Sequence, residues 1–501
     1  GPIIAAFTEI IGHRRGSAWH DRLARTVAKF NVAVFSIGAL FGVGLVATLV
    51  GFWPRLWAQM FNLYLWPMVV EVVNFLLEGI TVYAYFYTWN RFRRRKRLHI
   101  GIGLLASFFG MVTPLIINGV AASMLTSAGL GEHPFDRSLQ GLYLENPTYV
   151  ALTLHRLVGG LAFMGMCVAA VTAFQAWRLP SGSEKRYFTW ATNWTFMIGM
   201  VNLFLMPFIG FLYVHDIQQA VLPAFLNLMI GDYRYVFNLQ IFFLTLLFAG
   251  SNFYLTRLLQ SAPAGAGGDA TRPALGAVAA GAALALLTAG GLALRGAGPG
   301  SAATPADALA TLALVAGLYA VVAVLVGRLG RGQWGRVSRV VTLAVLLCTL
   351  IAIVPYRQGS ITIPIGRMWP WKFATLIGIT TLTLANVLIY LRARGHVARE
   401  LRERFSSTVL MAGALFSLFM MNVMGFAREG ARAPFLIYNI LRASEEPFET
   451  VIRSTTPMPL PNMLGFIVFN SAMVVLLSLV GLWIAFGDSA EAEPPAVASR
   501  Q

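Results

Sequence analysis

Long apolar stretches separated by short polar segments fill most of the sequence. An α-helix needs roughly 20 apolar residues to cross the hydrocarbon core of a bilayer, and these stretches reach that length. The pattern predicts twelve complete crossings, at 30–52, 66–89, 100–128, 149–178, 187–214, 234–257, 274–296, 304–327, 337–355, 371–393, 405–427 and 462–486. We therefore expect an all-α, polytopic transmembrane helical bundle in contact with lipid.

The first apolar run, from Pro2 to Gly12, is too short to span a bilayer and ends in His13, Arg14 and Arg15. A signal peptide carries its basic residues before the apolar segment, so this order argues against one. We interpret the run as a truncated N-terminal helix with a cytoplasmic basic flank.

The composition excludes a soluble domain. Hydrophobic residues make up 57% of the chain and charged residues only 12%, whereas a soluble domain carries about 25% charged residues. The net charge of +17 does not indicate nucleic-acid binding, because the basic residues lie in short clusters between apolar runs, the densest at 91–97. The two cysteines, Cys167 and Cys348, lie inside apolar runs and suggest neither a disulfide framework nor covalent haem attachment.

The loops alternate in charge along the chain. Basic residues collect in 13–29, 90–99, 179–186, 258–273, 328–336 and 394–404, while acidic residues occur in the longer loops 129–148, 215–233, 356–370 and 428–461. The positive-inside rule places the basic loops in the cytoplasm. We expect a multi-pass protein of a bacterial or archaeal cytoplasmic membrane.

Two acids, Glu71 and Glu78, lie within one predicted crossing. Seven residues is nearly two helical turns, so both side chains face the same side of the helix. A carboxylate at this depth is costly and is usually paired, protonated or functional. The pair is either structural, protonated or hydrogen-bonded, or it forms a proton path or a cofactor contact.

His155 lies near the outer start of another crossing, where an imidazole is a common haem ligand. Gly159 and Gly160, one turn later, leave room for a flat macrocycle, and Arg156 is suited to pair with a propionate. The alternative is a structural or proton-path histidine. His215, near the end of the next crossing, is more typical of an interfacial histidine.

Glu429 closes a late crossing and is flanked by Arg428 and Arg432. The simplest interpretation is an ion pair at the end of a helix. On the predicted topology Glu429 and His155 both lie toward the outer side, where a cofactor layer is possible.

Taken together, these segments resemble subunit I of the cytochrome bd oxygen reductases, the ubiquinol oxidases. VVEVVNFLLEGITVYAYFYTWNRF (69–92) is similar to the helix of that family that bears two glutamates. LHRLVGGLAF (154–163) is similar to the segment with the histidine ligand of low-spin haem b. EGARAPF (429–435) is similar to its E-x-G-R-Q-P-W signature.

The resemblance implies a set of roles. His155 would ligate low-spin haem b, with Met368 as the expected second ligand, and Glu429 would ligate a high-spin haem, of type b or d. Glu78 would line the high-spin site or its proton channel, with Glu71 beside it. Arg432 would hold a propionate or stabilise the negative charge of the site. The family also implies a second polytopic subunit in the same complex.

One departure from the family concerns the electron donor. The family's outer quinol-binding loop follows the crossing that ends near His215, but here DIQQAVLPAFL (216–226) lacks its expected Lys and Glu, and four crossings follow. The donor is therefore a quinol or a cytochrome c. We divide the chain into an N-terminal haem-binding core (1–233), an inserted four-helix region (234–370), a C-terminal core (371–487) and a cytoplasmic tail (488–501).

Two other classes of function remain open. A non-catalytic paralogue or electron-transfer subunit of a larger redox complex would keep the fold and one haem. A transporter would show broken helices around a substrate site at mid-membrane, and the sequence contains no clear pair of these.

Overall fold

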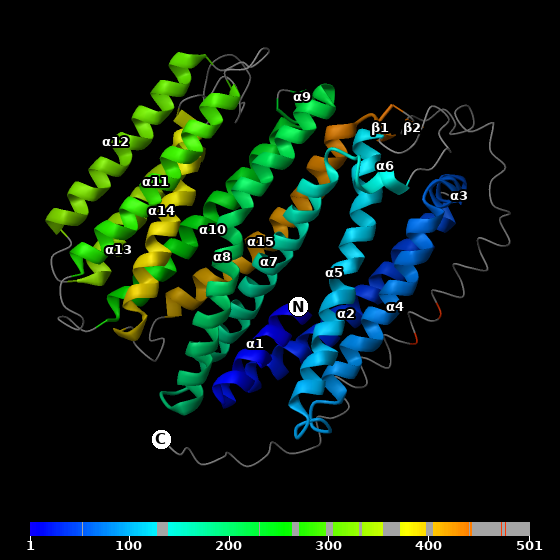
Figure 1. The fold of residues 1–501 in the computed structure, drawn as a ribbon, viewed down its shortest axis with the longest axis horizontal. Coiled ribbons are helices and arrows are strands. Elements are labelled where there is room, and N and C mark those ends of the chain that lie inside the picture. The colour runs from blue at the N-terminus through cyan, green and yellow to red at the C-terminus, as the bar shows by residue number, and fades with distance from the viewer. Residues whose placement is uncertain are drawn as a thin grey trace. The chain divides into compact units, whose positions relative to one another are not determined.

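The computed structural model describes residues 1–52, 54–127, 139–229, 231–262, 270–296, 304–329, 333–353, 371–396, 404–439 and 441–442, together with Ala472 and Leu476. Within these residues, eleven helices are long and apolar enough to cross a membrane. The protein is a multi-pass membrane protein with an all-helical fold (Figure 1).

The eleven predicted crossings between residues 30 and 427 are confirmed as helices. They are α2 (Ala18–Phe52), α4 (Leu65–Tyr87), α5 (Lys96–Thr126), α7 (Tyr149–Arg178), α8 (Ser183–Ala220), α10 (Arg234–Gln260), α11 (Thr271–Gly296), α12 (Pro305–Leu329), α13 (Trp334–Ile353), α14 (Trp371–Ala393) and α15 (Arg404–Arg432). The predicted crossing at 462–486 lies outside the described residues, apart from Ala472 and Leu476, which are helical.

The N-terminal apolar run forms helix α1 (Pro2–Arg15). It ends at Gly16, whose φ of 61° lies in the left-handed region that glycine adopts without strain. Its last turn carries His13, Arg14 and Arg15, which interact favourably with the negative end of the helix dipole.

Short elements connect the long helices. They are α3 (Pro54–Leu63), α6 (Leu139–Tyr143), α9 (Leu222–Met229), the 3-10 turn η1 (Arg394–His396), and the strands β1 (Phe435–Ile437) and β2 (Leu441–Arg442), which pair in a two-stranded sheet.

Several helices extend beyond the apolar runs that predicted them. Helix α2 begins at Ala18, and α8 continues past His215 to Ala220. Arginine, lysine and glutamine are good helix formers, so a helix does not have to stop where the bilayer stops. As a result, the predicted outer loop 215–233 is largely helical.

The chain separates into two compact units, of residues 1–157 with 437–501 (unit 1) and residues 158–436 (unit 2). In unit 1, α4 lies beside α5, and α1 packs on α2 and α5, as the blue and cyan ribbons in Figure 1 show. The predicted boundaries at 233, 370 and 487 remain a prediction.

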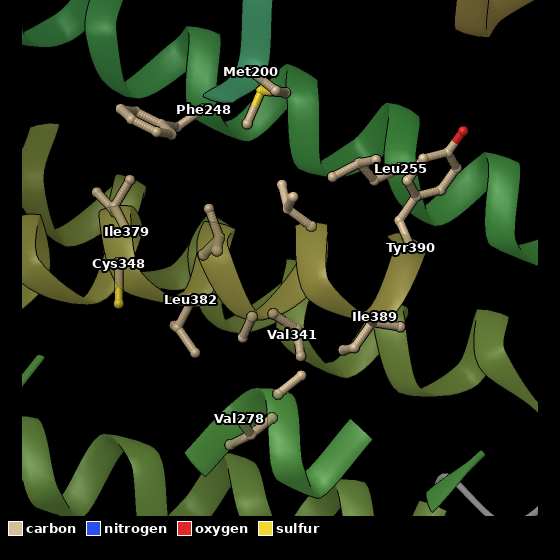
Figure 2. Close-up of a cluster of buried hydrophobic side chains, with 14 of the residues drawn as sticks. Met200, Phe248, Leu255, Val278, Val341, Cys348, Ile379, Leu382, Ile389 and Tyr390 are labelled. Carbon is tan, nitrogen blue, oxygen red and sulfur yellow. The ribbon is translucent and has the colours of Figure 1, made fainter. Parts of the chain in front are cut away.

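Helix α14 is the central helix of unit 2. It packs against α10, α11, α12 and α13, and 78% of its membrane-length segment is buried by protein. Figure 2 shows its apolar side chains, among them Ile379, Leu382 and Ile389, between Phe248 and Leu255 of α10 and Val341 of α13. Close packing of this kind holds membrane helices together, because lipid supplies no hydrophobic drive for association.

A buried polar network joins the same helices. The amide of Asn386 on α14 donates to Asn252 Oδ1 on α10 at 3.0 Å and to Thr342 Oγ1 on α13 at 3.1 Å. Ser338 donates to Asn386 Oδ1 at 2.6 Å, and Asn252 donates to Thr383 Oγ1 at 2.7 Å. Hydrogen bonds between membrane helices fix their register, since these groups find no partner in lipid.

Helices α7 and α8 approach closely at Gly165 and Gly199. A Cβ at Gly165 would lie 2.5 Å from the backbone nitrogen of Gly199 and 3.0 Å from the Thr195 carbonyl oxygen. Both obstacles are backbone atoms that cannot rotate away, so this crossing requires glycine.

We predict that Gly165→Ala lowers the thermal unfolding midpoint of the detergent-solubilised protein. Overpacking at a rigid contact costs about 1–3 kcal/mol. The matched control is Gly290→Ala on α11, where a Cβ meets nothing within 4 Å. Equal midpoints for the two variants would contradict the close helix crossing.

Candidate functional site

Helix α4 presents a row of polar side chains to α5. The Asn74 amide donates to Thr113 Oγ1 at 2.8 Å and to the Phe109 carbonyl at 3.0 Å. Thr113 in turn donates to Glu78 Oε2 at 3.0 Å. These bonds hold the Glu78 carboxyl group in one orientation at the middle of the α4–α5 interface.

The backbone of α5 leaves room for this carboxyl group. A Cβ at Gly110 would lie 3.1 Å from Glu78 Oε1, so a larger residue there would press on the carboxyl group.

Glu71, seven residues earlier on α4, differs from Glu78 in its hydrogen bonding. Its Oε2 atom is buried and has no hydrogen-bond partner within the part of the chain that the structure describes. An unpaired buried carboxyl oxygen suits a group that carries a proton or faces a ligand.

Tyr143 of α6 lies near Glu71, outside the membrane-spanning helices. Burial raises the pKa of Tyr143 to about 12, with smaller contributions from the neighbouring Tyr149 and Glu71. The Tyr143 hydroxyl therefore stays protonated and donates to the Ile116 carbonyl at 3.2 Å.

His155 is buried on α7, with 6% of its surface exposed. Its neighbour Arg156 donates a hydrogen bond to Asn118 Oδ1 on α5, and the amide of Asn118 donates to Thr153 Oγ1 at 3.2 Å. The start of α7 is thus fixed to α5 on both sides of His155.

One turn further along α7, two glycines leave space. A Cβ at Gly160 would meet nothing within 4 Å, and one at Gly159 would approach only the end of the Met206 side chain, at 3.2 Å. Gly160 lies on the exposed surface of the helix, and the room for a macrocycle beside it stays a prediction.

Glu429 lies in the last turn of α15 and pairs with two arginines. Arg432 donates to its Oε2 atom, and the Arg428 guanidinium lies 3.7 Å from Oε1. The Glu429 side chain is 48% exposed, whereas that of Arg432 is only 4% exposed. The Nε atoms of both arginines are buried without a hydrogen-bond partner among the described residues.

A residue that the sequence did not indicate fixes this helix end. The Asn227 amide, on α9, donates to the Gly430 carbonyl at 2.9 Å and to the Ala433 carbonyl at 3.1 Å. The ring of Tyr233 occupies the space that a Cβ at Gly430 would fill. Asn227 thereby satisfies two carbonyl groups that the end of the helix leaves open.

His215 and Met368 complete the predicted set. His215 is half-buried within α8, and its ring lies parallel to that of Phe211 with centroids 6.3 Å apart. Met368 lies outside the described residues. His155 belongs to unit 1 and Glu429 to unit 2.

The structure also reveals a cluster that sequence reasoning missed, formed by Glu9, Tyr85, Lys96 and His99. One signal for it was present, because Tyr85 follows Glu78 by seven residues, as Glu78 follows Glu71. No group of three or more His, Cys, Asp or Glu side chains in the described ranges is arranged to hold a metal ion.

The arrangement defines a class of protein: a multi-pass membrane bundle with a buried histidine, two carboxyl groups on one helix, and a carboxylate–arginine group at a helix end. Residues 2–223 match the family model for cytochrome bd terminal oxidase subunit I. This N-terminal part of the chain is therefore similar to that family. Proteins of that family are oxidoreductases that bind haem.

The fold is similar to that of a solved structure, the bd oxidase from Geobacillus thermodenitrificans. The TM-score is 0.50 at 14% sequence identity, and the match covers 96% of this chain and 92% of that chain. At an identity this low, the structural match supports a shared fold and nothing more. No curated protein matches the sequence at a significant level.

Proposed function

We propose that the protein is a haem-bearing subunit of a bd-type terminal oxidase, which passes electrons through a low-spin haem b to a high-spin site that reduces dioxygen to water. The observation that carries the proposal is the buried His155 on α7, inside the segment that matches the family model and beside the open space at Gly160.

The side chains present fit such cofactors. An imidazole from a helix is a suitable axial ligand for low-spin haem b. Glu429 has an exposed carboxylate suited to a high-spin haem, of type b or d. The buried Nε atoms of Arg428 and Arg432 leave N–H donors for a propionate, which guanidinium groups bind through charge-assisted hydrogen bonds. Met368 stays a predicted second ligand of haem b.

When bound, the haems supply the redox iron and the site for dioxygen. The protein orients the haems, excludes water from the site and delivers protons to it. Reduction of dioxygen to water consumes protons together with electrons, so buried carboxyl groups must deliver them. Glu78, held by Thr113, and Glu71, with its unpaired oxygen, are the groups we assign to that delivery.

We predict that Glu78→Gln slows oxygen reduction by about a hundredfold or more, the range associated with a lost proton-transfer group. Glutamine keeps the shape and the acceptor for Thr113 but cannot give up a proton, so haem content should stay near that of the unchanged protein. The measurement is oxygen consumption per haem, with Glu145→Gln as a control in a connecting segment. Unchanged turnover in Glu78→Gln would remove the proposed role.

The test of the whole proposal is a reduced-minus-oxidised absorption spectrum with pyridine haemochrome quantitation of the purified protein. Several haems per chain, including a high-spin component, are expected. A haem-free protein that is correctly folded would exclude the oxidase.

A second candidate is a non-catalytic paralogue or electron-transfer subunit, and one observation favours it. Helix α8 ends at Ala220, α9 covers Leu222–Met229 and α10 starts at Arg234, so few residues there are free to form a quinol-binding loop. This candidate predicts a single low-spin haem and no oxygen consumption. For the oxidase, the same observation leaves a quinol or a cytochrome c as the donor.

We further propose that the protein works in a bacterial or archaeal cytoplasmic membrane with a second polytopic subunit. Large apolar side chains, among them Phe41 and Leu45 on α2, are exposed along its helices. Lipid or another apolar subunit has to cover such a surface.

A further inference from the structure

An ionic cluster around the buried Glu9 and His99 side chains lies where α1 meets the start of α5 and the end of α4. Glu9 of α1 has no exposed surface, yet its Oε1 atom lies 2.7 Å from His99 Nδ1 and 2.8 Å from Lys96 Nζ. Its Oε2 atom accepts a hydrogen bond of 2.7 Å from the Tyr85 hydroxyl. The basic-loop pattern assigns this end of the helices to the cytoplasm.

The hydrogen bonds of His99 require an additional proton on the Glu9–His99 pair. His99 Nε2 lies 2.8 Å from the Tyr85 carbonyl oxygen, which only accepts, so Nε2 carries a hydrogen. In a neutral imidazole Nδ1 would then be an acceptor facing a carboxylate, which is also an acceptor. Their 2.7 Å contact is favourable only if a proton lies between them, on His99 or on Glu9.

The cluster is neutral when this proton is present. The charges of Glu9 and Asp21 balance those of Lys96 and protonated His99, and Lys96 Nζ lies 2.5 Å from Asp21 Oδ1. Loss of the proton would leave one uncompensated negative charge in a buried site, which attracts another proton. Lys96 and Asp21 are 16% and 40% exposed, so they connect the buried pair to water.

From this cluster a single helix face leads to Glu78. Glu71, Glu78 and Tyr85 are spaced by seven residues on α4 and therefore lie on one face. Two glycines on α5, also seven residues apart, face these side chains. A Cβ at Gly103 would touch the Tyr85 ring at 2.6 Å, and one at Gly110 would lie 3.1 Å from the Glu78 carboxyl group.

The span from Tyr85 to Glu78 is about 10 Å along α4, at 1.5 Å per residue. Ser107 lies between Gly103 and Gly110 on the same face of α5, and it is buried. Its hydroxyl donates to the Gly103 carbonyl at 2.7 Å. A proton that crosses this span needs the Ser107 hydroxyl and internal water molecules as carriers.

We infer that the Glu9–His99 pair is the cytoplasmic proton-loading site that supplies Glu78 along the α4–α5 interface. A proton enters from water at Lys96 and Asp21 and is held between Glu9 and His99. It leaves through the Tyr85 hydroxyl, which turns its O–H from Glu9 Oε2 toward Ser107, passes that proton on, and then takes the proton held by Glu9. The inference rests on the proposed oxidase function, because only that reaction consumes protons at Glu78.

The experiment uses the complete purified complex, fully reduced with dithionite, freed of excess dithionite without air and then mixed with oxygenated buffer, so that no native electron donor is needed. A pH-indicator dye follows proton uptake while absorbance follows haem reoxidation. We expect Tyr85→Phe and Glu9→Gln to slow proton uptake about tenfold, a loss of roughly 1.4 kcal/mol of transition-state stabilisation. We also expect a larger solvent deuterium isotope effect and unchanged haem content.

The matched control is Tyr83→Phe. Tyr83 is a buried tyrosine on the same helix whose hydroxyl lies 2.9 Å from the hydroxyl of Ser36, away from the cluster. Tyr85→Phe and Tyr83→Phe remove the same atom, so a structural effect of a lost hydroxyl would appear in both. Slow uptake in Tyr85→Phe alone supports the inference, and this variant decides the matter if Glu9→Gln fails to assemble.

Two other outcomes distinguish a failure of the loading site from a failure of the proposed function. If Glu78→Gln slows uptake while Tyr85→Phe and Glu9→Gln match the control, the loading site is wrong and the oxidase stands. If the wild-type complex contains no high-spin haem or takes up no protons on mixing with oxygen, the proposed function fails and the inference fails with it.

Discussion

His155→Leu is expected to remove the low-spin haem b that we propose for the protein and to lower oxygen consumption at least about a hundredfold. No other histidine is suggested for this site by the sequence, and haem without its axial nitrogen is held weakly. The measurement is the reduced-minus-oxidised spectrum, in which the low-spin component should disappear, together with the pyridine haemochrome count, which should fall by one haem per chain.

The control for this prediction is His215→Leu on α8. His215 is half-buried against Phe211, and its replacement should leave the haem count unchanged. Because Arg156 is bonded to Asn118, the start of α7 should keep its position in both variants. If the low-spin signal survives in His155→Leu, His155 is a structural histidine and the assignment of this site is wrong.

The second large effect is expected at Glu429. Glu429→Ala removes the carboxylate and leaves the buried guanidinium of Arg432 without its partner, so the high-spin component should be lost and oxygen consumption should fall at least about a hundredfold. The low-spin haem at His155 should remain. Retention of the low-spin haem would show that the variant is folded and that only the high-spin haem is lost.

Two further variants sharpen this result. Glu429→Gln keeps an acceptor for Arg432 but not the negative charge, so it should restore stability without restoring the high-spin haem. Glu184→Gln, in the first turn of α8, is a control for the same substitution far along the chain. Normal high-spin haem in Glu429→Gln would show that Glu429 serves only as an ion pair at the end of the helix.

The two carboxyl groups on α4 show what the spacing of residues along the sequence can predict and what it cannot. Their spacing placed Glu71 and Glu78 on one helix face, which follows from helix geometry alone. What distinguishes them came from elsewhere in the chain. Thr113, 35 residues away, bonds to Glu78, whereas Glu71 keeps an oxygen without a partner among the described residues.

Glu9 shows the opposite case. In the sequence it is one acid in a short apolar run, whose only notable feature is its basic end. Its partner His99 is 90 residues away, and Asn227 is 203 residues from the Gly430 carbonyl that it fixes. Side chains so far apart meet only through helix packing, so no local spacing could have indicated these contacts.

The sequence by itself determined the helices and the family resemblance. A bilayer offers no hydrogen-bond partners, so each crossing has to be a long apolar helix, and that length is visible in the sequence. Only the tertiary structure decided which polar groups pair inside the bundle. Those pairs depend on which helix faces meet, and every apolar helix has several faces that are equally acceptable to lipid.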